Sequence, residues 1–121
     1  TANRLFSLTR EDIDAFTDLT GDANSRHHGE KPIAHGLLTA SKISALLGTV
    51  LPGEGTIYLS QNLRFTAMVY PGDPLTATVK VMTQIGRKLY LETTITNNQT
   101  GIVVIEGEAI VLIPEGLECP S

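Results

Sequence analysis

The sequence predicts an α+β domain in which one curved antiparallel sheet of about five strands wraps around a single long helix. In the first half of the chain the apolar residues recur at helical spacing, whereas from Thr56 onward they alternate with polar residues, as in half-buried strands. Helical and strand segments are grouped and do not alternate, which favours α+β over βαβ organisation. A chain of 121 residues has the length of one domain, which we expect to span residues 1–121.

The N-terminal elements are expected to be a short strand over residues 4–8 and a short helix. Thr9 offers a hydroxyl that can cap this helix, and the acidic residues after it suit the positive end of the helix dipole. Three apolar residues then follow at intervals of three, on one helical face: Ile13, Phe16 and Leu19. We expect the helix to end at Gly21.

The long helix is expected over residues 36–50. Its residues are mostly apolar, and Lys42 is its only charged one. Apolar residues on nearly every side indicate a helix that is buried almost all round. The Pro-Gly-Glu-Gly sequence at residues 52–55 marks its stop and a turn.

Four alternating runs after this turn predict the remaining strands, within residues 57–65, 75–81, 89–95 and 102–113. Turn signals separate the later runs, namely Tyr-Pro-Gly-Asp at residues 70–73 and the segments 86–88 and 97–101. Because these connections are short, sequential antiparallel pairing is the expected topology.

Composition and charge narrow the class of function. The net charge is −4 at pH 7, so the chain presents no positive field for a polyanion and we expect no nucleic-acid partner. A single cysteine, Cys119, fits a reducing compartment better than a disulfide-stapled scaffold. The sequence contains neither a charged leader before an apolar run nor a long apolar stretch. We therefore expect no membrane span and a cytoplasmic protein.

The segment between Leu19 and Gly36 gathers the residues that can carry chemistry. It contains the carboxylate of Asp22, the amide of Asn24 and three imidazoles, among many residues that break helices and strands. Asp22 and His27 lie five positions apart on this irregular segment, where both can turn toward one small volume. A carboxylate and an imidazole placed together can move protons at neutral pH.

The residues of this segment resemble those of a known family. The runs FTDLTGDANSRH at residues 16–27 and PIAHGLL at residues 32–38 are similar to the signature of the MaoC-like (R)-specific enoyl-CoA hydratases. The stretches IYLSQNLRF at residues 57–65 and YPGD at residues 70–73 also resemble this family, so the resemblance covers most of the chain. It implies a hot-dog fold and a homodimer formed edge to edge.

The resemblance also implies an activity, that of a hydro-lyase that adds water reversibly to trans-2-enoyl-CoA and gives (R)-3-hydroxyacyl-CoA. Asp22 would take a proton from the attacking water, and His27 would hold this water and pass a proton to the α-carbon. Each positioned proton transfer is worth about 10²- to 10⁴-fold in rate. The substrate is expected to be an acyl-CoA or acyl carrier protein thioester, and neither a cofactor nor a metal is expected.

Three further residues are assigned to substrate binding. Gly36 opens the long helix, where a free backbone N–H can donate to the thioester oxygen as charge develops on it. Asn24 matches the amide of the family motif, and its main effect is expected on the shape of the loop. Ser44 matches a position at which the family has a hydroxyl near the catalytic pair.

The chain departs from the family pattern in two places. Ser25 stands where the motif usually has proline, which should relax the loop. Only residues 28–31 separate His27 from Pro32, where the family usually has a longer, partly helical segment that helps to cover the acyl pocket. Either a true deletion or a piece missing from the sequence can explain this short connection.

Several alternatives stay open. The carrier can be acyl carrier protein, in a 3-hydroxyacyl dehydratase, or the protein can be a hot-dog thioesterase or a non-catalytic acyl-binding module. A metal site is disfavoured because the histidines and Asp22 have no helical ligand spacing. His28 and His35 are expected to take no part in the chemistry, and His35 to cap or pack at the helix start. Candidates for the acyl pocket wall are Ala40, Ile43 and Leu47.

Overall fold

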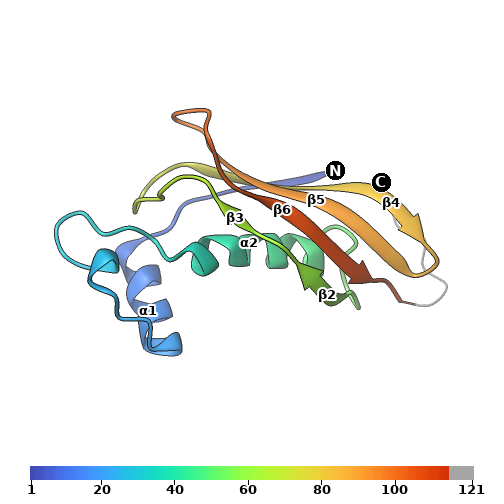
Figure 1. The fold of residues 1–121 in the computed structure, drawn as a ribbon, viewed down its shortest axis with the longest axis horizontal. Helices are drawn as coiled ribbons and strands as arrows, with labels where there is room; N and C mark the ends of the chain where they lie inside the picture. Colours follow the sequence, from blue (N-terminus) through green and yellow to red (C-terminus); the bar gives the residue numbers. More distant parts are fainter. Residues whose placement is uncertain (115–121) are drawn as a thin grey trace.

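The computed structural model describes residues 1–114 of the chain. A curved sheet lies along one side of the longer helix, and the shorter helix packs near one end of the molecule (Figure 1). The elements in chain order are β1 (Ala2–Phe6), α1 (Arg10–Thr20), the 3-10 turn η1 (Ser25–His27), α2 (Gly36–Thr49), β2 (Ile57–Gln61), β3 (Arg64–Phe65), β4 (Leu75–Ile85), β5 (Lys88–Asn97) and β6 (Val103–Leu112). The predicted α+β class and the single long helix are confirmed.

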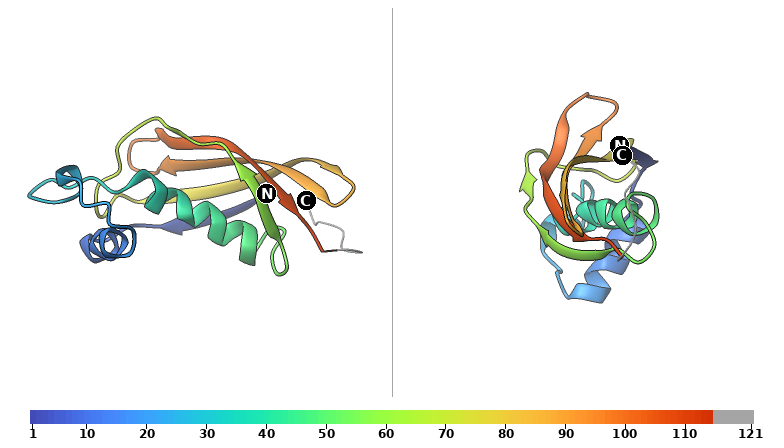
Figure 2. Two further views of the ribbon diagram at one scale, coloured as in Figure 1. Left: turned by 60° about the horizontal axis from the view of Figure 1, so that its bottom comes forward. Right: turned by 90° about the vertical axis from the view of Figure 1, so that its right-hand side faces the viewer.

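The described strands form one antiparallel sheet in the order β1-β4-β5-β6-β2, with β3 also paired to β6. The hairpins β4–β5 and β5–β6 confirm sequential pairing in the second half. The expectation was wrong for β2, which joins β6 and not β4. The sheet curls around α2 so that β2 and β3 close its far edge, while β1 takes the place beside β4 (Figure 2).

Helix α1 begins and ends where the sequence predicts. The Thr9 hydroxyl accepts a hydrogen bond from the Asp12 N–H at 3.1 Å, and the Asp12 carboxylate accepts one from the Thr9 N–H at 2.9 Å. This reciprocal pair satisfies two N–H groups that would otherwise lack partners. At the other end Gly21 adopts a φ of 79° and donates its N–H to the Thr17 carbonyl at 2.8 Å.

Helix α2 packs one face against the concave side of the sheet. Its buried residues are Thr39, Ala40, Ile43, Leu46 and Leu47. Leu37 and Val50 are exposed, so the expectation of a helix buried nearly all round was wrong. The reason is architectural: the sheet covers one side of α2, and in residues 1–114 no second layer covers the other side. None of the helices in this range is long and apolar enough to cross a membrane.

One glycine allows the sheet edge to close. The backbone oxygen of Asn62, between β2 and β3, would lie 1.9 Å from a Cβ placed on Gly107 of β6. Only a residue without a side chain fits there. Asn62 also bonds Glu108 twice, through its N–H to the Glu108 carbonyl and through its side-chain oxygen from the Glu108 N–H, both at 3.0 Å.

Candidate active site

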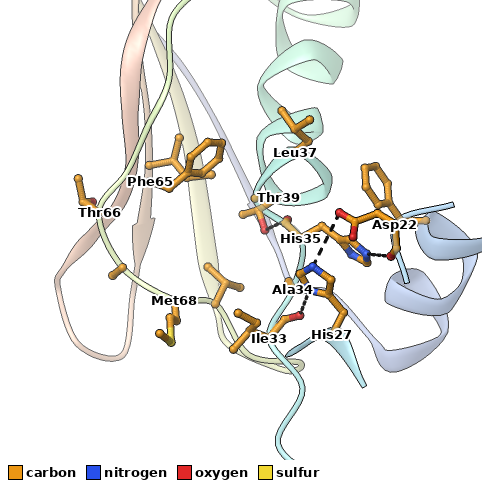
Figure 3. Close-up of a pocket in the computed structure, with 15 residues that line it drawn as sticks. Asp22, His27, Ile33, Ala34, His35, Leu37, Thr39, Phe65, Thr66 and Met68 are labelled. Atoms are coloured by element: carbon orange, nitrogen blue, oxygen red, sulfur yellow. Dashed lines mark hydrogen bonds and ion pairs between the residues drawn. The ribbon is translucent and has the colours of Figure 1, made fainter. Parts of the chain in front are cut away.

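A cavity of about 540 Å³ opens between the start of α2, the loop before it and the segment after β3 (Figure 3). The residues that line it are Phe16, Asp22, His27, Ile33, Ala34, His35, Gly36, Leu37, Thr39, Phe65, Thr66, Ala67, Met68, Val69 and Ile105. Asp22, His27 and Gly36, three of the residues assigned from the sequence, therefore lie on one cavity wall. Asn24 and Ser44 do not line it.

His27 is held by the backbone on the far side of the short connection. Its Nδ1 lies 2.8 Å from the carbonyl oxygen of Ile33. A carbonyl only accepts, so Nδ1 carries the proton and, in the neutral ring, Nε2 carries the free lone pair. The N–H of Ile33 in turn donates to the carbonyl of Arg26 at 2.8 Å. Ile33 thus fixes the backbone beside His27 and one nitrogen of its ring.

Asp22 faces the free nitrogen of His27. One carboxylate oxygen lies 3.9 Å from His27 Nε2, and the other accepts a hydrogen bond from the Asn24 N–H at 3.4 Å. The Asp22 side chain is 52% exposed and that of His27 13%. A separation of 3.9 Å is too long for a direct hydrogen bond, but one water molecule can bond to both groups across it.

Asn24 shapes the loop, as expected. Its side-chain oxygen accepts a hydrogen bond from the Arg26 N–H at 3.0 Å and caps η1. Its side chain does not reach the cavity wall. This hydrogen bond holds the backbone in a turn between Asp22 and His27, so Asn24 affects the site by shaping the loop.

Gly36 is the first residue of α2, so its N–H has no acceptor within the helix. The helix dipole adds partial positive charge at this end. The ring of Phe65 lies directly over Gly36, because a Cβ placed there would be 2.6 Å from Phe65 Cε1. The start of α2 therefore offers a backbone donor beside the cavity, and a side chain at position 36 would collide with the Phe65 ring.

Other residues assigned from the sequence lie elsewhere. Ser44 is exposed on α2, eight residues beyond Gly36 and thus about 12 Å along the helix axis. The structure does not bring it to Asp22 and His27. The three candidate wall residues, Ala40, Ile43 and Leu47, are buried in the core and do not line this cavity, so the structure places all three on the core side. They face the sheet, whereas the cavity surrounds only the first turn of α2.

His35 lies much closer to the pair than sequence reasoning placed it. It is 2% exposed, and its ring stacks on that of His27 with centroids 3.7 Å apart. The expected packing role is confirmed, but the side chain makes no capping hydrogen bond to α2. By contrast His28 points toward Asp14, with 3.5 Å between ring nitrogen and carboxylate.

Asp22, His27 and His35 each place one potential ligand atom within 4.8 Å of the others. The ring planes of the two histidines lie only 23° apart in a stack. An imidazole binds a metal ion in its own plane, so two stacked rings do not aim their lone pairs at a common point. The three groups therefore do not fit a shared metal ion. Cys119, the lone cysteine, lies outside the described residues.

The chain is similar in sequence and in structure to known hydratases and dehydratases. A family model described as MaoC like domain matches residues 2–102. The (R)-specific enoyl-CoA hydratase of Rhodospirillum rubrum is 43% identical over 117 residues, covering 89% of this chain and 81% of that protein. The 3-hydroxybutyryl-CoA dehydratase of Methylorubrum extorquens is 38% identical, covering 89% and 74%. The solved structure of the (R)-hydratase from A. caviae involved in PHA biosynthesis has a TM-score of 0.89 and 37% identity, covering 93% of each chain.

Proposed function

We propose that this chain, which belongs to the MaoC-like domain family with its hot-dog fold, is an (R)-specific enoyl-CoA hydratase. The observation that carries the proposal is the pairing of Asp22 with His27 in one cavity beside the free N–H of Gly36. Hydration of a conjugated thioester requires this set: two groups that handle protons and one donor for the oxygen that gains charge.

The proton movements balance if the cycle starts with Asp22 ionised and His27 protonated at Nε2. Asp22 removes a proton from water as the water oxygen bonds to the β-carbon. The electron pair of the double bond moves to the α-carbon, which takes the Nε2 proton of His27. The proton on Asp22 then returns to His27 across the gap between them, 3.9 Å in the structure, and both groups are restored. The reverse sequence gives dehydration.

Gly36 is proposed to stabilise the thioester oxygen while the water adds. A preorganised backbone donor at such an oxygen is worth about 3 kcal/mol of barrier. The apolar residues Leu37, Phe65 and Met68 line the same cavity and are proposed to contact the acyl chain. Coenzyme A is the proposed carrier, since the two relatives named above act on CoA thioesters by name.

The direct test mixes the protein with a short trans-2-enoyl-CoA and follows the absorbance of the conjugated thioester, beside a colour reaction for free thiol. We expect loss of absorbance, no thiol and an (R)-3-hydroxyacyl product. Asp22→Asn and His27→Ala should each lower kcat by at least about 10²-fold. Thiol release without hydration would make the protein a thioesterase, and turnover of the acyl carrier protein thioester alone would change the carrier. If both variants keep full activity, the site assignment is wrong.

We also propose that the protein is a homodimer in the cytoplasm. Strands β2 and β3 form one edge of the sheet, and the apolar residues Ile57 and Leu59 of β2 are 54% and 46% exposed in the single chain. An edge of this kind is a template for pairing with a second copy. Leu59→Lys should halve the mass measured by light scattering, whereas Leu5→Lys on the opposite edge strand β1 should not. A monomeric parent protein would contradict the proposal.

A further inference from the structure

One buried histidine has no part in the proton transfers proposed above. His35 is 2% exposed, and its ring lies between the ring of Phe16, 4.6 Å away, and that of His27, 3.7 Å away. A polar ring buried among aromatic rings is costly unless hydrogen bonds satisfy it. One hydrogen bond of His35 goes to the backbone of Asp22, and its ring contacts that of His27.

The hydrogen bonds of His35 fix its tautomer. Its Nε2 lies 3.1 Å from the backbone oxygen of Asp22 and 3.2 Å from the hydroxyl of Thr17. Because a carbonyl only accepts, Nε2 must carry the proton and donate to Asp22. Nδ1 is buried without a partner among the described residues. In their neutral forms His27 and His35 are therefore opposite tautomers, with the proton on Nδ1 in His27 and on Nε2 in His35.

Stacking on His35 limits the tilt of the His27 ring, which the hydrogen bond from His27 to Ile33 alone does not. The bond from Nδ1 to the Ile33 carbonyl fixes one ring atom but leaves the ring free to tilt about it. The ring of His35, nearly parallel at 23°, blocks this tilt on one side. The direction of Nε2 toward Asp22 thus depends on the neighbouring ring as well as on Ile33.

We propose that His35 is a positioning residue that fixes the positions of Asp22 and His27 relative to the N–H of Gly36. It bonds the backbone of Asp22, stacks on His27 and directly precedes Gly36 in the chain. Three groups that must meet one substrate are thereby tied to a single side chain. A misplacement of about 1 Å in such a site costs about 10²-fold in rate. The kinetic part of this inference rests on the proposed hydratase function.

The first test needs no activity and no variant. Long-range ¹⁵N–¹H NMR spectra report which ring nitrogen of each histidine carries a proton, and the chain has only three histidines to assign. We expect a proton on Nε2 of His35 and on Nδ1 of His27 in the neutral rings. A proton on Nδ1 of His35, or rapid exchange between its tautomers, would overturn the inference because the bond to Asp22 would then be absent or transient.

The second test separates the two contacts. His35→Phe keeps a ring for the stack and loses the donor, whereas His35→Gln keeps a donor and loses the stack. We expect kcat for hydration to fall by about 10²-fold in both, with KM and the circular dichroism spectrum nearly unchanged. His28→Gln is the matched control, since His28 contacts Asp14 and Thr17, and it should leave kcat unchanged.

The outcomes distinguish this inference from the proposed function. Unchanged kcat in both folded variants, or a loss that appears only in KM, refutes positioning by His35. If the variants fail to fold, the tautomers of the parent protein decide. If the parent protein does not hydrate enoyl thioesters, the proposed function fails, and the NMR result still decides whether His35 holds Asp22.

Discussion

Replacing Gly36 by alanine is expected to remove most of the hydratase activity and leave the fold intact. The added Cβ would lie 2.6 Å from Cε1 and 2.8 Å from Cδ1 of Phe65, so one of the two residues must move. Phe65 lines the cavity and is 52% exposed, so its ring can turn on its own side-chain bonds. The ring should therefore move, and the backbone of α2 should stay in place.

Gly36→Ala has two effects of opposite sign on the free energy of unfolding. Alanine is favoured over glycine in a helix by up to about 1 kcal/mol. Forcing the Phe65 ring away from its preferred position costs about 0.5 to 1.5 kcal/mol. The free energy of unfolding of Gly36→Ala should thus lie between about 1.5 kcal/mol below and about 0.5 kcal/mol above that of the parent.

The effect of Gly36→Ala on the rate of hydration has no compensating gain. The new methyl group stands beside the N–H proposed to bind the thioester oxygen, and the Phe65 ring that must move lines the cavity proposed to hold the acyl group. Complete loss of one such donor costs about 3 to 4 kcal/mol, or about 10²- to 10³-fold in kcat. We expect kcat/KM to fall by about 10²-fold.

The assay pairs hydration of trans-2-enoyl-CoA with chemical unfolding of the same samples. Gly48→Ala is the matched control, because Gly48 lies in the same helix and a Cβ there meets nothing within 4 Å. It should keep full activity and gain up to about 1 kcal/mol of stability. Full activity in a folded Gly36→Ala protein would refute the proposed role of this N–H. A large loss of stability would refute the reasoning about Phe65.

Three further substitutions test the fold through the free energy of unfolding. Gly107→Ala should lose about 3 kcal/mol, the upper end of the usual cost of overpacking, because its Cβ meets the Asn62 backbone oxygen at 1.9 Å and backbone moves less easily than a side chain; near-native stability would mean that the β2–β3 edge is loosely held. Thr9→Ala should lose about 1 kcal/mol with the reciprocal cap of α1, and no change would show that the cap is idle. Leu46→Ala should lose about 2 to 5 kcal/mol, since Leu46 is fully buried under the sheet; a loss below 1 kcal/mol would contradict this packing.

The features that the sequence predicted well are local ones. The cap at Thr9 and the stop at Gly21 each depend on contacts between residues within about one helical turn. Such contacts can be predicted from neighbouring residues in the sequence. The pairing of β2 with β6 is set by how the sheet closes around α2, and no neighbouring residue encodes it. A sequence pattern shows which residues are apolar but not whether another layer of the protein covers them. We therefore expected α2 to be more buried than it is.

The site divides in the same way. Asp22 and His27 were found because they occur in one motif, and the structure brings them into one cavity. Ser44 was assigned by family position alone, although eight residues of helix place it about 12 Å from Gly36. His35 was set aside because a stack between two rings eight positions apart in an irregular segment leaves no periodic signal.

The two hydrogen bonds at Ile33 have a consequence for how this family can vary. One joins its N–H to Arg26 and the other joins its carbonyl to the His27 ring, so residues 28–32 form an excursion whose two ends are pinned together. Its length is then uncoupled from the geometry of the reacting groups. The two groups proposed to move protons can then keep their arrangement whether this excursion is long or short. The excursion is a natural position at which to graft a new lid and redesign substrate range.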